Sequence, residues 1–181
     1  DEHRPNELRM RVFGGDDVRI LKEDDALFWM GLFKTSSSRF LGCALESKET
    51  SEVHVIDLEA VVGGDAHLRA AQGLRVISPR KKMLRYDVYH HHKDFLIVTN
   101  KDGAKTNKLC SVAIDSKSWD HSQWMDMKAY DKAVQVDGVR TFDKYVAIFG
   151  REGGVTQMWI ADAKKGTKGL ATWKKASFPE K

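Results

Sequence analysis

The sequence predicts an all-β chain that forms a partial β-propeller, with about three four-stranded antiparallel blades and the end of a preceding blade. Short apolar runs alternate with clusters of turn-forming residues, a pattern that is typical of β-strands. A pair of such strands occurs three times, and each copy ends in an aspartate. These aspartates, Asp57, Asp115 and Asp162, stand 58 and then 47 positions apart. That spacing is close to one propeller blade of roughly 40–50 residues.

Each copy begins with an aromatic residue and contains two strands joined by a polar turn. The paired strands are predicted at 40–45 and 53–57, at 95–99 and 109–115, and at 145–149 and 155–162. An inner strand precedes each pair, at 27–33, 86–90 and 134–140, and an outer strand follows it, at 75–78, 123–127 and 173–178. The three blades are therefore expected to cover approximately residues 27–79, 83–128 and 133–178.

The beginning of the chain fits the same scheme. Strands at 8–13 and 18–21 are expected to form the end of a preceding blade, at 8–23. Residues 1–181 are therefore expected to form a single segment of a propeller domain. A helix is predicted only at 65–72, as an inserted turn. We interpret the aspartates at the strand ends as turn residues, because such a carboxylate can bond a backbone N–H two residues further on. A β-sandwich is the rival architecture, since its turns recur every 8–12 residues or so, but the longer repeat favours a propeller.

The charge balance indicates an ordinary solvated surface. Thirty basic and 26 acidic residues are interspersed and give a net charge of +4. A patch for RNA or for an anionic membrane is the alternative, but no recognition helix or basic arm accompanies the charge, so neither nucleic acid nor membrane is expected as a partner. The densest basic cluster, Arg80-Lys81-Lys82, is placed in a loop between blades. Cys43 and Cys110 are interpreted as buried thiols, with a disulfide left open, and favour a cytoplasmic location.

No motif in the sequence indicates catalysis, a cofactor or a bound metal. Gly-X-Ser-X-Gly, His-Glu-X-X-His, Cys-X-X-Cys and the glycine-rich phosphate loops do not occur. We therefore predict no catalytic, cofactor-binding or metal-binding residue. The run His90-His91-His92 is interpreted as a solvated hairpin turn. A metal-binding tract is the alternative, but consecutive strand residues point to opposite faces.

Other conspicuous residues are predicted to have structural roles. Phe28, Trp29 and Phe33 are interpreted as packing between blades, although aromatic residues can also form a platform for RNA bases. The remaining tryptophans are interpreted in the same way: Trp119, Trp124, Trp159 and Trp173. The acidic turn of Glu23, Asp24 and Asp25 is expected to be solvated, with a contribution to the wall of a central channel as the alternative.

Several segments resemble the propeller of oligopeptidase B. At 28–40 an aromatic pair, a glycine and the run Lys-Thr-X-Ser-X-Arg-Phe precede a strand, as they do in that family. Residues 50–53, 99–109 and 154–158 are similar to later turns and hairpins of the same propeller. The motifs occur in family order and cover about residues 8–163. Departures are the serine run at 36–38, the insertion at 65–72 and the histidine run.

The resemblance implies a serine peptidase of the prolyl oligopeptidase family. Such enzymes join a seven-bladed propeller to an α/β-hydrolase domain, which carries the catalytic serine, aspartate and histidine and lies C-terminal to the propeller. Oligopeptidase B enzymes cut short peptides after arginine or lysine, and the propeller excludes large folded substrates. The expectation is therefore a non-catalytic gating segment, whose partners are the rest of the propeller, the hydrolase domain of the same chain and short peptides. A stand-alone β-rich interaction module, which would oligomerise through its open sheet edges, is the alternative.

Overall fold

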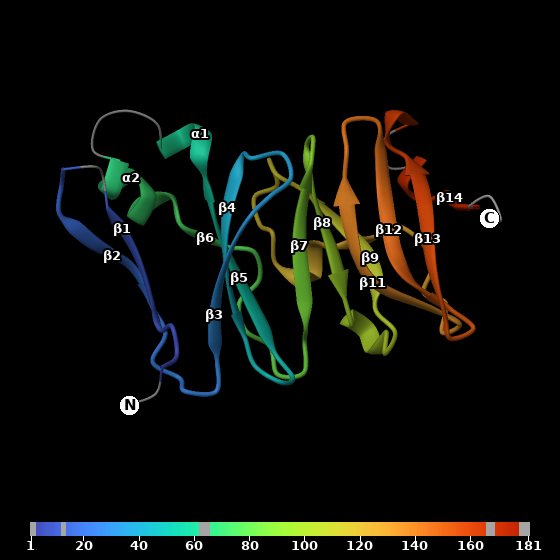
Figure 1. Cartoon of the computed structure of the whole chain (residues 1–181), viewed down its shortest axis with the longest axis horizontal. Coiled ribbons are helices and arrows are strands. Elements are labelled where there is room, and N and C mark those ends of the chain that lie inside the picture. The colour runs from blue at the N-terminus through green and yellow to red at the C-terminus, as the bar shows by residue number, and fades with distance from the viewer. Residues whose placement is uncertain (1–2, 12–13, 62–65, 166–168, 178–181) are drawn as a thin grey trace. The chain divides into compact units, whose positions relative to one another are not determined.

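The computed structural model describes residues 3–11, 14–61, 66–165 and 169–177 (Figure 1). Within these residues one two-stranded and three four-stranded antiparallel sheets follow one another along the chain. This arrangement confirms the predicted fold class, a partial β-propeller with three blades and the end of another. The chain divides into two compact units, Asp1–Leu84 and Arg85–Lys181.

The first unit contains a hairpin and one four-stranded sheet. The hairpin pairs β1 (Glu7–Arg11) with β2 (Asp17–Lys22). The sheet has the strand order β3-β4-β5-β6. Its strands are β3 (Trp29–Lys34), β4 (Phe40–Glu46), β5 (Ser51–Asp57) and β6 (Arg75–Val76). Leu8 of the hairpin is buried with Phe28, Met30 and Leu45, so hairpin and sheet share a core.

Two short helices, α1 (Leu58–Val61) and α2 (Ala66–Gly73), separate β5 from β6. The second helix confirms the predicted insertion apart from Asp65, which lies outside the described residues. The first helix was not predicted, because four residues are too few to show a helical period. Similarly, residues 12–13 and 178 of the predicted strands lie outside the described residues.

The second unit contains two four-stranded sheets. The first has the strand order β10-β9-β8-β7. Its strands are β7 (Tyr86–His91), β8 (Asp94–Thr99), β9 (Lys108–Ala113) and β10 (Met125–Asp126). The second has the strand order β11-β12-β13-β14. Its strands are β11 (Val134–Thr141), β12 (Tyr145–Glu152), β13 (Val155–Asp162) and β14 (Trp173–Lys175). The short 3-10 helices η1 (Lys101–Gly103), η2 (His121–Gln123) and η3 (Ala163–Lys165) lie in the links.

One hydrophobic core joins the two sheets of the second unit. Leu96 and Val98 from β8 are buried in the same cluster as Val146 and Ile148 from β12. On the opposite face of β8, the Phe95 ring lies 5.0 Å from the Trp119 ring in an edge-to-face arrangement. Because both faces of β8 are covered, its sequence is a continuous apolar run instead of an alternating one.

A β-bulge shapes β11 where it pairs with β12. The register shifts between Val136 and Gly138, and Val136 pairs with Gly150 on β12. A Cβ added to Gly150 would lie 1.9 Å from the backbone oxygen of Gln135. Gly150 therefore allows the two backbones to approach closely beside the bulge.

The aspartates at the strand ends make the predicted turns in two of the three copies. Asp57 accepts a hydrogen bond from the backbone N–H of Glu59 at 3.1 Å, and Asp162 accepts one from that of Lys164 at 3.0 Å. Asp57 also pairs with Arg39 at 2.8 Å, so it fastens the turn before β4 as well.

Candidate functional site

The three consecutive histidines lie at the hairpin that joins β7 to β8. His92 and Lys93 form the turn, and His92 is exposed with a backbone φ of +51°. His90 and His91 are only 4% and 6% exposed. The predicted solvated turn is therefore right for His92 and wrong for the other two, because β7 continues through His91 and carries both imidazoles into the packed region.

This hairpin is bonded to the equivalent hairpin of the next sheet, between β11 and β12. The Nε2 atom of His91 lies 3.0 Å from the carbonyl oxygen of Phe142, and that of His92 lies 2.8 Å from the carbonyl oxygen of Asp143. Thr141 donates its hydroxyl to the carbonyl oxygen of His90 at 3.1 Å. The histidine run therefore fastens two neighbouring blades at one end of their strands, a role that the sequence did not indicate.

The buried imidazole of His91 is expected to make this contact sensitive to acid. Burial and the adjacent His92 lower the pKa of His91, against the opposing effect of its hydrogen bonds to backbone carbonyls. A depressed pKa in the folded state gives stability that is present above the unfolded value of about 6.5 and is lost as the pH falls. In the full-length protein, lowering the pH from 7.5 to 5.5 should increase amide hydrogen exchange at 141–146, after correction for the intrinsic rate.

The substitution His91→Gln should reduce this acid response, since an amide can donate to Phe142 but does not titrate in this range. The matched control is His92→Gln, which keeps the burial of His91, the larger cause of its lowered pKa, and should therefore keep most of the response. An acid response in His91→Gln as large as in the unsubstituted protein would contradict the assignment to His91.

A buried ammonium group lies at the beginning of β9, in the first sheet of the second unit. Only 6% of the Lys108 side chain is exposed, and its Nζ donates to Asp102 at 3.0 Å and to Asp126 at 2.9 Å. The Cys110 thiol donates to the same Asp126 at 3.3 Å. Burial and this hydrogen bond raise the pKa of Cys110 to about 12, and burial raises the pKa of Cys43 to about 11. Both cysteines are buried free thiols, as predicted, and both stay protonated at neutral pH.

A second charged cluster ties the end of β2 to the chain that follows β6. Glu23 is 5% exposed and pairs with Arg80, whose guanidinium also lies 3.8 Å from the centre of the Phe28 ring. Glu52 accepts a hydrogen bond from the backbone N–H of Arg80 at 2.9 Å and another from His54 at 3.0 Å. Burial would raise the pKa of Glu52, but these bonds hold it below its usual value. The expectation of a solvated turn is therefore wrong for Glu23.

The aromatic residues follow the packing interpretation with one exception. Phe28, Trp119, Trp124 and Trp159 are buried, and Phe33 and Trp173 are half-buried. Trp29 is 60% exposed, because successive side chains of β3 point to opposite faces and its neighbour Met30 takes the core position.

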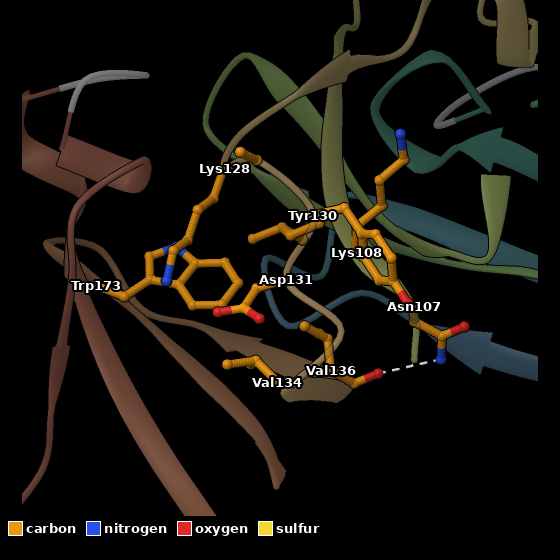
Figure 2. A pocket seen from close by; sticks show the side chains of 10 residues that line it. Asn107, Lys108, Lys128, Tyr130, Asp131, Val134, Val136 and Trp173 are labelled. Carbon is orange, nitrogen blue, oxygen red and sulfur yellow. Dashed lines mark hydrogen bonds between the residues drawn. The ribbon is translucent and has the colours of Figure 1, made fainter. Parts of the chain in front are cut away.

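A pocket opens in the second unit where the link from β10 to β11 crosses the sheets (Figure 2). It is a shallow depression, and the space of about 250 Å³ between its walls includes open solvent. Buried Val134 and Val136 of β11 form its apolar floor, and Trp173 of β14 forms one wall. The link contributes the side chains of Lys128 and Asp131 beside the indole, as Figure 2 shows.

The described ranges contain no group of three or more histidine, cysteine, aspartate or glutamate side chains that could hold a metal ion. No helix among them is long and apolar enough to cross a membrane. The charged clusters instead make structural pairs, and the open pocket beside Trp173 is a candidate place for a ligand.

Comparison with known proteins relates the chain to a family of peptidase propellers. Residues 14–179 match the family model of the prolyl oligopeptidase N-terminal β-propeller domain. Protease 2 of Moraxella lacunata is 30% identical over 164 residues, which are 88% of this chain and 22% of that protein. Dipeptidyl aminopeptidase BI of Pseudoxanthomonas mexicana is 26% identical over 148 residues, or 81% of this chain and 19% of that protein.

Two solved structures show the same likeness in three dimensions. Oligopeptidase B from Leishmania major superposes with a TM-score of 0.82 at 27% identity, and oligopeptidase B from Trypanosoma brucei with a TM-score of 0.80 at 28% identity. Each match covers 98% of this chain and 24% of the other. The chain thus spans about a fifth to a quarter of the length of these relatives.

Proposed function

Since this chain belongs to the N-terminal β-propeller domain family of the prolyl oligopeptidases, we propose that it is the filtering part of a serine oligopeptidase. In this proposal the two units contribute blades to a seven-bladed ring. The ring admits short peptides to a catalytic domain elsewhere in the polypeptide and excludes folded proteins. The likeness to oligopeptidase B over 98% of the chain carries the proposal.

The packing of the second unit supports a rigid filter. A filter must keep its blades together while peptides pass, and the two sheets of this unit share one buried core. The bonds from His91 and His92 to Phe142 and Asp143 fasten the same two sheets at a hairpin end. These contacts oppose separation of the blades, which is the motion that would let a folded protein through.

The chemistry is assigned to residues outside this segment. We expect hydrolysis by an activated serine of the catalytic domain, after a basic residue of the peptide. A matched pair of short peptides, differing only by Arg or Gln before the cleaved bond, should differ in kcat/KM by at least about tenfold in favour of arginine. Equal cleavage of the two peptides would overturn the basic preference.

The location of the nucleophile can be tested with a fluorophosphonate probe on the full-length protein. The probe should label one serine, and mapping of the labelled peptide should place that serine outside residues 1–181. Labelling within residues 1–181, or a full-length protein that hydrolyses peptides without reacting with the probe, would contradict the proposal.

A further inference from the structure

We propose that the pocket beside Trp173 binds the arginine side chain of a peptide. In the structure the side chain of Lys128 occupies the position on the Trp173 ring that this arginine would take. The pocket lies on this segment, so binding there does not depend on peptide hydrolysis elsewhere in the protein. It is distinct from the proposed filter, which requires only that the blades stay together.

The aromatic wall of the pocket already carries a cation. The Nζ atom of Lys128 lies 4.7 Å from the centre of the Trp173 ring, within the range of about 6 Å for a cation–π contact. Trp173 is held in position for this contact, because its indole N–H donates to the carbonyl oxygen of Leu170 at 2.7 Å. The Trp159 ring lies 6.1 Å away in a tilted arrangement and supports it further. The indole is thus a preorganised surface for a positive group.

The remaining walls suit the stem and the charge of a long basic side chain. Val134 and Val136 line the base of the pocket, and since they are only 7% and 3% exposed they offer methylene groups a small apolar surface. Asp131 lies beside the indole in Figure 2, and the backbone N–H of Ala133 donates to its Oδ1 at 2.9 Å, which fixes the direction of the carboxylate. A cation on the indole would therefore lie next to an oriented negative charge.

The third charged residue that lines the pocket, Lys108, already has acidic partners. The Lys108 ammonium donates to both Asp102 and Asp126, so its positive charge is paired within the first sheet. When the Lys128 side chain moves away, Asp131 is the remaining net charge among the residues that line the pocket. The pocket then favours a cation and disfavours an anion.

Arginine fits this combination better than lysine. A guanidinium is planar, can stack on an indole face and can bond a carboxylate through two N–H groups, whereas an ammonium is a strongly hydrated point charge. Lys128 lies in the exposed link between β10 and β11, and an exposed cation–π contact is weak. An arginine should therefore be able to displace it.

Lys128 and the peptide arginine compete for the same indole face. Removing Lys128 should therefore raise the affinity for the peptide, whereas removing the charge of Asp131 should lower it. The full-length protein, labelled with 5-fluorotryptophan and with its active serine blocked by a fluorophosphonate, is titrated with acetyl-Gly-Arg-Gly-amide and followed by fluorine NMR. The Trp173 signal is assigned from Trp173→Phe. The arginine peptide should shift this signal, and acetyl-Gly-Gln-Gly-amide should not.

Three variants then separate the contributions. Lys128→Ala should tighten binding of the arginine peptide by about two- to fivefold, the value of one exposed cation–π contact. Asp131→Asn should weaken it by at least about threefold. The matched control Lys132→Ala removes a neighbouring exposed lysine of the same link that does not line the pocket and should leave the affinity unchanged.

Unchanged or weaker binding in Lys128→Ala, or equal binding of the glutamine peptide, would overturn the proposal. These outcomes are read at Trp173 in a protein whose hydrolysis is blocked. They therefore stand whether or not the proposed peptidase activity is found, and failure of the filter proposal would leave the binding result intact.

Discussion

Replacing Gly150 by alanine is expected to destabilise the second unit by about 3 kcal/mol, because the added Cβ has no room. It would lie 1.9 Å from the backbone oxygen of Gln135, 3.0 Å from the carbonyl carbon of that residue and 3.3 Å from Cζ3 of Trp159. A flexible side chain can turn away from such a contact, whereas a backbone carbonyl in a paired strand moves only if the pairing of β11 with β12 changes. Gln135 itself pairs with Arg151 on β12, so its backbone belongs to that ladder.

The measurement is urea-induced unfolding of the full-length protein, with hydrogen exchange at 145–161 to locate the loss. The matched control is Gly31→Ala on β3, where no atom lies within 4 Å of the added Cβ. It should change the free energy of unfolding by less than about 0.5 kcal/mol, as surface substitutions usually do. If the two substitutions had the same effect within that margin, the close approach at Gly150 would be refuted.

Replacing Arg80 by leucine is expected to cost about 2–3 kcal/mol of unfolding free energy. Glu23 is 6% exposed at its side chain and pairs with Arg80, so the substitution leaves a buried carboxylate without its cation. Breaking a fully buried pair in this way costs about 3–5 kcal/mol, and the 30% exposure of Arg80 reduces the expected value. Loss of the guanidinium above the Phe28 ring adds a smaller contribution.

A second substitution shows whether the orphaned carboxylate is the cause. Glu23→Gln in the Arg80→Leu background removes the charge and should recover at least about 1 kcal/mol in urea unfolding. The matched control, Lys82→Ala, removes an exposed lysine from the same loop and should stay within about 0.5 kcal/mol of the unsubstituted protein. A double variant no more stable than Arg80→Leu would place the loss in packing instead of in charge.

The sequence predicted those parts of the fold that local pattern determines. Phe95 begins a continuous apolar run, and Gly153-Gly154 separates two further runs, so β8 and the hairpin of β12 and β13 could be placed from their own residues. Asp57 and Asp162 make their turns with residues two positions away. In each case the interacting residues are close in sequence, and composition is enough to recognise them.

The contacts that the sequence did not predict join distant residues. Glu23 and Arg80 are 57 positions apart, and His91 and Phe142 are 51 apart. Nothing in an acidic turn or a histidine run indicates which remote group will meet it, so both were interpreted as solvated. The pocket has the same origin: Trp173 was predicted to pack, but its contact with Lys128 depends on how β14 lies against the link before β11.

The filtering role is tested most directly by comparing one cleavage site in two settings. The full-length protein is given an arginine-containing peptide of eight residues, and the same eight residues within a surface loop of a stable folded protein. We predict that kcat/KM for the free peptide is higher by at least about a hundredfold, which corresponds to about 2.7 kcal/mol. Cleavage of the folded substrate within tenfold of the free peptide would contradict the role of this segment as a filter.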